Sequence, residues 1–437
     1  MLPHPPVQIL GGSRLEGRIG IQGAKGCAVL LAAAAFIADG RVSLANVPSI
    51  LDIETVAHIA HELGHQAQLN GRNFEFFFNS QTRYPIIPTD LGRRLRITPS
   101  LAAAILAKEG RVRFPLPGGD AFCPRPIDRH VAAMEAAGAT VEKDGAVLTA
   151  RLGRGRPSPF KFSADTRNGP SLGVTITALL LASRAQGTSL ITKPSPEPEV
   201  EHVISFLNGC GIATRHRFDG AIEVAGRTDV SGTRQVLPPD RLEAGTLAIG
   251  AALTGGSVTL LGFSQENLPE EFWSLLRSAG ARIESGADGC TVTMGSRPGE
   301  NDCDHSITTS PHPGFPTDLQ PQGTVLATQM AGITHIHEGV HELRASHVEG
   351  LRSFGARLSA RGRAITVTGA TPLKAAEVVG EDIRCVVAYM LAALVADGYS
   401  TIHGGYHLRR GHGDLLGSLR ALGADVHQLE EEVSSHE

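Results

Sequence analysis

The sequence predicts an α/β protein built from six repeated units, with β-sheets that face outward around buried helices. An Ala- and Leu-rich segment that runs into a glycine and then a short β-rich stretch occurs six times. Each of these segments is followed by a second, short apolar stretch that ends in a glycine. Successive glycines of this second set are 68 to 75 residues apart. Self-similarity at a set period indicates repeated supersecondary units that share a core. The segments are 30–44, 101–114, 178–191, 247–260, 324–337 and 387–402, and the trailing glycines are Gly64, Gly138, Gly211, Gly280, Gly355 and Gly423.

Each unit is expected to contain a strand, a helix, a second strand, a second helix and a hairpin, in that order. The Ala- and Leu-rich helices are apolar nearly all round, and a helix of this kind is buried on all sides. After the trailing glycines, apolar and polar residues alternate around a glycine-containing turn, as in 139–150, 281–294 and 356–369. This alternation predicts hairpins. The sheets should therefore lie outside the helices.

Six units divide naturally into two domains of three units each. The boundary is expected between the third and fourth units, near 234–239. One domain then comprises residues 24–236 and includes the 115–130 loop. The other comprises residues 237–437 together with residues 1–23, because the first strand precedes the first helix and can complete the far half.

The composition argues against several classes of partner. The net charge is −4 with both signs mixed, so neither nucleic acid nor an anionic membrane is an expected partner. The six cysteines form no CxxC pair, which indicates reduced thiols, and the N-terminus has no secretory signal pattern. We expect a cytoplasmic protein that binds small-molecule substrates. His335 and His337 would share one face of a strand, but no partner stands at ligand spacing, so no metal site is predicted.

Charged residues stand just before most of the buried helices. Free N–H groups and the helix dipole favour anions at these ends, so neighbouring lysine and arginine suit phosphate and carboxylate ligands. The third unit has a serine there and no cation after Arg167. The alternative, that such residues only cap helices, stays open for Asp240 and Asp382. The residues concerned are Lys25, Arg96, Ser171, Asp240, Arg241, Glu243, Asp318, Asp382 and Arg384.

The 115–130 segment combines a flexible turn with charge. Gly118 and Gly119 allow a tight, mobile turn, Asp120 stands at its tip, and Arg125 follows on a stretch stiffened by Pro126. A flexible acid followed by a fixed arginine fits a lid that closes on an anion and delivers a proton. By pattern alone, an exposed loop with incidental charges is an equally good interpretation.

The chain resembles the enolpyruvyl transferases over essentially its whole length. The resemblance rests on several motifs that occur in the same order as in that family. The chain is more similar to the cell-wall branch, which uses UDP-N-acetylglucosamine, than to the shikimate-pathway branch. The motifs are GAK (23–25), LPGGDAFCPRPID (116–128), EPE (197–199), LPPDRLEAGT (237–246), PHPGFPTDLQPQ (311–322), Arg344, EDIR (381–384) and YHLRRG (406–411).

The resemblance implies both a fold and a reaction. The fold is two inside-out α/β domains that close over a cleft. The reaction transfers the enolpyruvyl group of phosphoenolpyruvate to an acceptor hydroxyl through a tetrahedral ketal, releases phosphate, and needs no metal or organic cofactor. Asp318 then matches the base, and Asp120 matches the residue that protonates the methylene carbon. Guanidinium groups match phosphate and carboxylate well.

The resemblance also assigns the remaining site residues. Lys25, Arg125 and Arg410 match phosphate-binding positions, and Arg344 and Arg384 match cations near phosphoenolpyruvate. The RPID run lies against the uridine end of the acceptor. The implied catalytic residues are Asp120, Asp318, Lys25 and Arg410, and the implied substrate-binding residues are Arg96, Arg125, Pro126, Ile127, Asp128, Ser171, Arg241, Arg344, Asp382 and Arg384.

Asp120 stands where the cell-wall branch usually has a cysteine, and this predicts resistance to fosfomycin. Fosfomycin acts by alkylating that cysteine, whereas a carboxylic acid can still protonate carbon. We expect phosphate release to continue after incubation with the drug. Time-dependent inactivation with a covalent adduct would contradict the prediction, and mass spectrometry would show whether Cys123 carries the adduct instead.

Two departures from the family pattern concern the acceptor. The family has Lys-Asn where this chain has Lys25 and Gly26, and that Asn faces the reacting sugar. The family also has a diphosphate-binding lysine where this chain has Gly169. We therefore favour UMP, whose 3′-hydroxyl some family members modify in nucleoside-antibiotic biosynthesis. UDP-N-acetylglucosamine in peptidoglycan synthesis is the alternative acceptor, and a non-catalytic nucleotide-binding scaffold is the alternative of another class.

Overall fold

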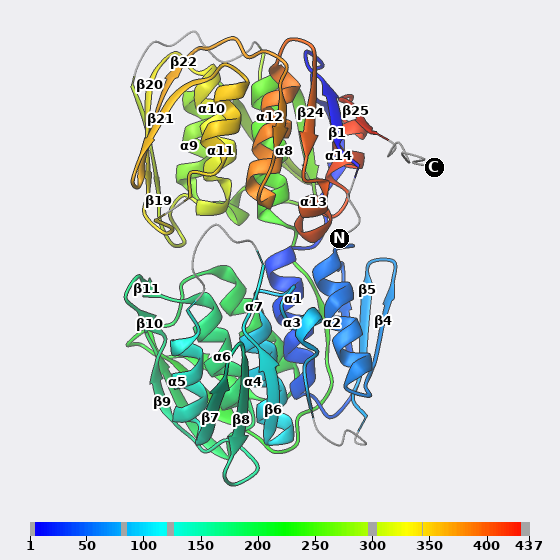
Figure 1. Cartoon of the computed structure of the whole chain (residues 1–437), viewed down its shortest axis with the longest axis vertical. Helices are drawn as coiled ribbons and strands as arrows, with labels where there is room; N and C mark the ends of the chain where they lie inside the picture. The colour runs from blue at the N-terminus through cyan, green and yellow to red at the C-terminus, as the bar shows by residue number, and fades with distance from the viewer. Residues whose placement is uncertain (1–4, 80–84, 120–125, 296–303, 343, 430–437) are drawn as a thin grey trace. The chain divides into compact units, whose positions relative to one another are not determined.

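Six sheets of three or four strands, together with a two-stranded ribbon, form the strand part of the described chain. The computed structural model describes residues 5–79, 85–119, 126–295, 304–342 and 344–429 (Figure 1). Asp120, Cys123 and Arg125 lie outside the described residues. The chain divides into two compact units, Gly23–Pro238 and Met1–Gln22 with Pro239–Glu437.

The six larger sheets share one pattern of pairing. In four of them a first strand runs parallel to a second, which pairs antiparallel with one arm of a hairpin. In the fifth, the place of the hairpin is taken by two strands from opposite ends of the chain, Val7–Leu10 and Asp425–Gln428. In the sheet of order β6-β8-β7, the parallel bridge between Ile86 and Arg113 takes the place of the first strand.

The unit Gly23–Pro238 holds three of these sheets, with orders β15-β3-β5-β4, β6-β8-β7 and β13-β14-β12-β9. Their strands are β3 (Val42–Ala45), β4 (Gln66–Asn70), β5 (Asn73–Phe77), β6 (Arg111–Pro115), β7 (Ala139–Asp144), β8 (Val147–Leu152), β9 (Lys161–Ser163), β12 (Gly187–Thr192), β13 (Ala213–His216), β14 (Ile222–Gly226) and β15 (Arg234–Val236).

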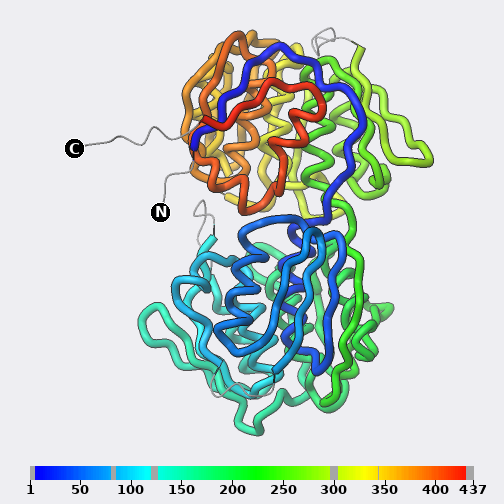
Figure 2. Tube along the Cα trace, turned by 90° about the vertical axis from the view of Figure 1, so that its right-hand side faces the viewer, coloured from blue at the N-terminus to red at the C-terminus, as the bar shows by residue number. Residues whose placement is uncertain are grey.

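The other unit holds sheets of order β23-β24-β1-β25, β17-β18-β16-β2 and β19-β20-β22-β21. The N-terminal strand β1 lies between β24 and the C-terminal β25, so both ends of the chain belong to this unit, as the blue and red segments in Figure 2 show. The strands are β1 (Val7–Leu10), β2 (Glu16–Gly20), β16 (Ser257–Leu261), β17 (Arg282–Gly286), β18 (Gly289–Thr293), β19 (His305–Thr309), β20 (Gly332–Glu338), β21 (Arg357–Arg361), β22 (Ala364–Gly369), β23 (Glu377–Val379), β24 (Tyr399–His403) and β25 (Asp425–Gln428).

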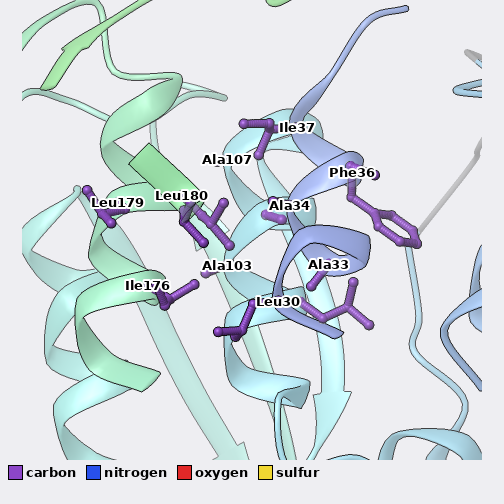
Figure 3. Packing of buried hydrophobic residues seen from close by; sticks show 14 of the residues in the cluster. Leu30, Ala33, Ala34, Phe36, Ile37, Ala103, Ala107, Ile176, Leu179 and Leu180 are labelled. Carbon is purple, nitrogen blue, oxygen red and sulfur yellow. The ribbon is translucent and has the colours of Figure 1, made fainter. Parts of the chain in front are cut away.

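Three buried helices form the centre of each unit. In Gly23–Pro238 these are α1 (Lys25–Ala34), α4 (Thr98–Glu109) and α6 (Leu172–Ser183), whose apolar side chains pack on one another (Figure 3). In the other unit they are α8 (Arg241–Thr254), α10 (Gln320–Gln329) and α12 (Ile383–Val395). Alanine-rich sequence allows such helices to approach closely, because small side chains leave little between the backbones.

The remaining helices have one apolar face. In α9 (Glu270–Ser278), for example, Phe272, Trp273 and Leu276 are buried while the acidic first turn is exposed, which is typical of a helix that covers a core. No helix in the described ranges is both long and apolar enough to span a membrane. The other such helices are α2 (Leu51–Glu62), α3 (Thr89–Gly92), α5 (Asp128–Ala136), α7 (Pro198–Gly209), α11 (His347–Ser353), α13 (Gly405–Gly411) and α14 (Leu415–Ala421).

Candidate functional site

Two arginines converge on the carboxylate of Asp318. Asp318 lies in the 3₁₀ turn Thr317–Leu319, immediately before the buried helix α10. Arg344 Nη1 donates to Asp318 Oδ1 at 2.7 Å, and Arg384 donates to the same oxygen from Nε at 3.1 Å and Nη2 at 2.9 Å. The side chain of Asp318 is 29% exposed and that of Arg344 only 3%. Three residues predicted as site residues therefore meet, and the carboxylate remains partly accessible.

A buried glutamate holds the arginine in place through a threonine, and sequence reasoning did not select either residue. Arg344 Nη1 also donates to Thr317 Oγ1 at 2.8 Å, and Thr317 Oγ1 donates to Glu338 Oε1 at 2.9 Å. Glu338 is 2% exposed and accepts the N–H groups of Val340 and His341 on the same oxygen. The only signals in the sequence are that Thr317 precedes Asp318 and that Glu338 ends the strand before Arg344.

Asp382 caps helix α12 and so fixes the backbone of Arg384. Its Oδ1 accepts the N–H groups of Arg384 at 2.8 Å and Cys385 at 3.1 Å, and its Oδ2 accepts from Ser346 Oγ at 2.7 Å. Burial alone would raise the pKa of Asp382, but hydrogen bonds from Ser346 and Cys385 and the charge of Arg384 together lower the pKa. The carboxylate is therefore anionic at neutral pH and stabilises the start of the helix.

Asp240 likewise caps a buried helix, α8, by accepting the N–H groups of Leu242 and Glu243. Glu243 accepts the N–H of Gln22 at 3.0 Å, and the Gln22 amide donates to the carbonyl of His412 at 3.1 Å. Asp240 and Asp382 therefore both cap their helices. Arg241 begins α8, and Arg410 lies in the last turn of α13 and is 7% exposed.

In the unit Gly23–Pro238, three predicted residues stand at the starts of the central helices. Lys25 begins α1 with its Nζ 3.4 Å from Asp52 Oδ2, Arg96 precedes α4, and Ser171 caps α6. Figure 3 shows α1, α4 and α6 running side by side in the same direction. A hydrogen bond from Ser100 Oγ to the carbonyl of Gly173 ties the first turns of α4 and α6 together. The N-terminal ends of these helices therefore gather at one end of the unit.

His130 lies beside this end and was not predicted from the sequence. It follows Pro126, Ile127 and Asp128, which lead into α5, and its Nδ1 is 2.7 Å from Thr177 Oγ1 on α6. Burial, together with the charge of Arg96, lowers the pKa of His130 to about 4, so the imidazole is neutral at pH 7. Its position directly after the RPID run is the one signal that could have selected it.

Gly169 occupies a position that only glycine adopts readily. It starts β11 (Gly169–Pro170), which pairs with β10 (Asp165–Thr166) around a turn at Arg167 and Asn168. Its φ is +91°, in the left-handed region, and Thr166 Oγ1 donates to its carbonyl at 2.8 Å. A lysine here would strain the backbone. The conformation of this turn therefore explains why position 169 is a glycine.

Comparison with known proteins identifies the family. The model of EPSP synthase (3-phosphoshikimate 1-carboxyvinyltransferase) matches residues 9–419. The chain belongs to this family of enolpyruvyl transferases. It is 35% identical over 433 residues to the UDP-N-acetylglucosamine 1-carboxyvinyltransferase of Brucella ovis, covering 97% of this chain and 99% of that protein.

Solved structures agree with this assignment. The enolpyruvyl transferase NikO from Streptomyces tendae has 25% sequence identity and a TM-score of 0.84, with 97% of this chain and 99% of that chain covered. EPSP synthase from Acinetobacter baumannii, at 18% identity and a TM-score of 0.72 over 97% of this chain and 100% of that chain, shares the α/β fold. The chain is therefore an enzyme of the enolpyruvyl transferase class, as the resemblance implied.

Proposed function

We propose that this enolpyruvyl transferase moves the enolpyruvyl group of phosphoenolpyruvate to the 3′-hydroxyl of UMP and releases phosphate. The observation that carries the choice of acceptor is Gly169, whose φ of +91° suits glycine at the place where the family has its diphosphate-binding lysine. An acceptor with a single phosphate needs fewer cations than one with a diphosphate. The RPID run, which the family uses at the uridine end, is present at residues 125–128.

Asp318 acts as the base in this proposal. It takes the proton of the acceptor hydroxyl, the hydroxyl oxygen bonds to C2 of phosphoenolpyruvate, and Asp120 gives a proton to C3, which produces the tetrahedral ketal. In the elimination, the Asp120 carboxylate takes a proton back from C3 while the C2–O bond to phosphate breaks, which restores the double bond and releases phosphate. The contacts of Arg344 and Arg384 to Asp318 Oδ1 keep the carboxylate oriented for the first step.

The cations bind the anionic substrates. Lys25, Arg125 and Arg410 take the phosphate, Arg344 and Arg384 lie near the carboxylate and phosphate of phosphoenolpyruvate, and preorganised charge stabilises the transition state. The remaining predicted residues bind the acceptor or complete these contacts, and they are Arg96, Pro126, Ile127, Asp128, Ser171, Arg241 and Asp382. We also infer that six repeated units form two inside-out α/β domains, with three units each around buried helices. We infer further that the protein works in the cytoplasm.

UDP-N-acetylglucosamine is the second candidate acceptor. Its support is the name of the Brucella ovis relative, to which this chain is 35% identical. In that case the loss of side chains at Gly26 and Gly169 would be a local variation within cell-wall synthesis.

A phosphate-release assay with purified enzyme and phosphoenolpyruvate distinguishes the two acceptors. We expect turnover with UMP and little or none with UDP-N-acetylglucosamine, because the diphosphate contact at position 169 is missing. Mass spectrometry of the product should show the enolpyruvyl group on UMP. Rapid turnover of the sugar nucleotide with none of UMP would refute the proposal and establish the alternative.

A further inference from the structure

Glu338 is a buried carboxylate that makes its side-chain hydrogen bonds through one oxygen. It ends strand β20 and is 2% exposed. Its Oε1 accepts from Thr317 Oγ1 at 2.9 Å and from the N–H groups of Val340 and His341 at 2.9 Å and 2.8 Å. Its Oε2 is buried and has no hydrogen-bond partner among the described residues. An unsatisfied buried oxygen costs free energy, and a cost of this kind is typical of functional sites.

The bond from Thr317 to Glu338 fixes the direction of a hydrogen-bond chain that reaches Asp318. A carboxylate only accepts, so the single hydroxyl proton of Thr317 points to Glu338. The hydroxyl oxygen is then oriented to accept, and Arg344 Nη1 donates to it at 2.8 Å. The same nitrogen carries a second hydrogen and donates to Asp318 Oδ1 at 2.7 Å. Glu338 therefore determines, through Thr317, how the guanidinium lies against Asp318.

The whole chain lies within one compact unit. Thr317 and Asp318 stand before α10, Glu338 ends β20, and Arg344 stands before α11, all within Pro239–Glu437. The geometry of the chain is thus complete without any contribution from Gly23–Pro238.

We propose that Glu338 is a positioning residue for the general base, and that it acts through Thr317 to keep Arg344 in the orientation that directs Asp318 at the acceptor hydroxyl. This inference rests on the proposed role of Asp318 and not on the choice of acceptor. Glu338 itself exchanges no proton with the substrate. The purely structural alternative is that Glu338 only holds the turn at Val340 and His341.

Variants of Thr317 separate the two roles, because they alter the chain and leave the turn bonds of Glu338 in place. Valine has nearly the shape of threonine without its hydroxyl, whereas serine keeps the hydroxyl. We expect Thr317→Val to lower kcat by about 10-fold to 100-fold, with KM for phosphoenolpyruvate within about 3-fold of wild type because Arg344 is still present. Thr317→Ser should restore kcat to within a few-fold of wild type.

Glu338→Gln tests the other end of the chain. An amide can donate as well as accept, so it no longer dictates where the hydroxyl proton of Thr317 points. We expect a loss of kcat similar to that of Thr317→Val. The double variant should be no slower than the slower single variant, because two changes in one chain are not additive.

Glu377→Gln is the matched control, since Glu377 is also a strand glutamate. Its side chain is 73% exposed and pairs with His403 at 2.8 Å, so wild-type kcat is expected. Thermal unfolding of each variant gives the folded fraction to which kcat is referred.

The inference is overturned if Thr317→Val or Glu338→Gln keeps the wild-type kcat, if Thr317→Ser fails to restore it, or if the losses of the single variants multiply in the double variant. Failure of the proposed function is seen separately. Turnover by Asp318→Asn near the wild-type rate would remove the base, and turnover of UDP-N-acetylglucosamine without UMP would change the acceptor, with which the same variants would then be compared.

Discussion

Asp318→Asn is expected to lower kcat for phosphate release by about 10²-fold to 10⁴-fold, the usual contribution of a positioned general base. The amide has nearly the shape of the carboxylate and still accepts from Arg344 and Arg384, but it cannot take the proton of the acceptor hydroxyl. Binding of phosphoenolpyruvate should change much less than kcat. Steady-state phosphate release and equilibrium binding of each substrate would measure the two effects separately.

Asp288→Asn is the control for this variant. Asp288 pairs with Arg18 at 2.6 Å, its side chain is 69% exposed, and an exposed pair contributes about 0–1 kcal/mol. We expect wild-type turnover from it. Turnover by Asp318→Asn within a few-fold of wild type would remove Asp318 from the role of base and reopen the assignment of that step.

Local patterns in the sequence predicted the buried helices and the chemistry class well. The apolar all-round composition of 101–109 predicted a buried helix, and α4 has its apolar residues buried along nearly its whole length. The motif around Asp318 and Arg384 led to the enolpyruvyl transferases, which the family match confirms. Both features depend on residues that are close together in the sequence. Helix periodicity and motif spacing are therefore enough to predict them.

The contacts between distant segments could not be predicted in the same way. Glu338 is linked to Arg344 through Thr317, which lies 21 residues before Glu338 in the sequence. A lone glutamate at the end of a strand usually faces solvent, so the sequence gives no reason to single out Glu338. Its role depends on which segments the fold brings together.

Arg344→Ala is expected to reduce both stability and substrate binding. Arg344 is buried and joins Asp318 to Thr317, beside the buried carboxylate of Glu338. Removing one partner of a buried ion pair costs about 3–5 kcal/mol. Asp318 is partly exposed and keeps its contact with Arg384, so this variant should lie at or below the lower value. We also expect KM for phosphoenolpyruvate to rise by about 10-fold or more, since a hydrogen bond to an ionised group is lost.

Arg352→Ala provides the matched comparison, because it removes an arginine from the neighbouring helix α11. Arg352 pairs with Glu349 at 2.8 Å, but its side chain is 45% exposed and that of Glu349 is 83% exposed, so its loss should cost less than about 1 kcal/mol. Thermal and denaturant unfolding would compare the two variants, and titration of phosphoenolpyruvate would compare KM. If both variants unfold alike, the buried network does not stabilise this part of the fold. If Arg344→Ala is less stable yet keeps the wild-type KM, Arg344 has only a structural role.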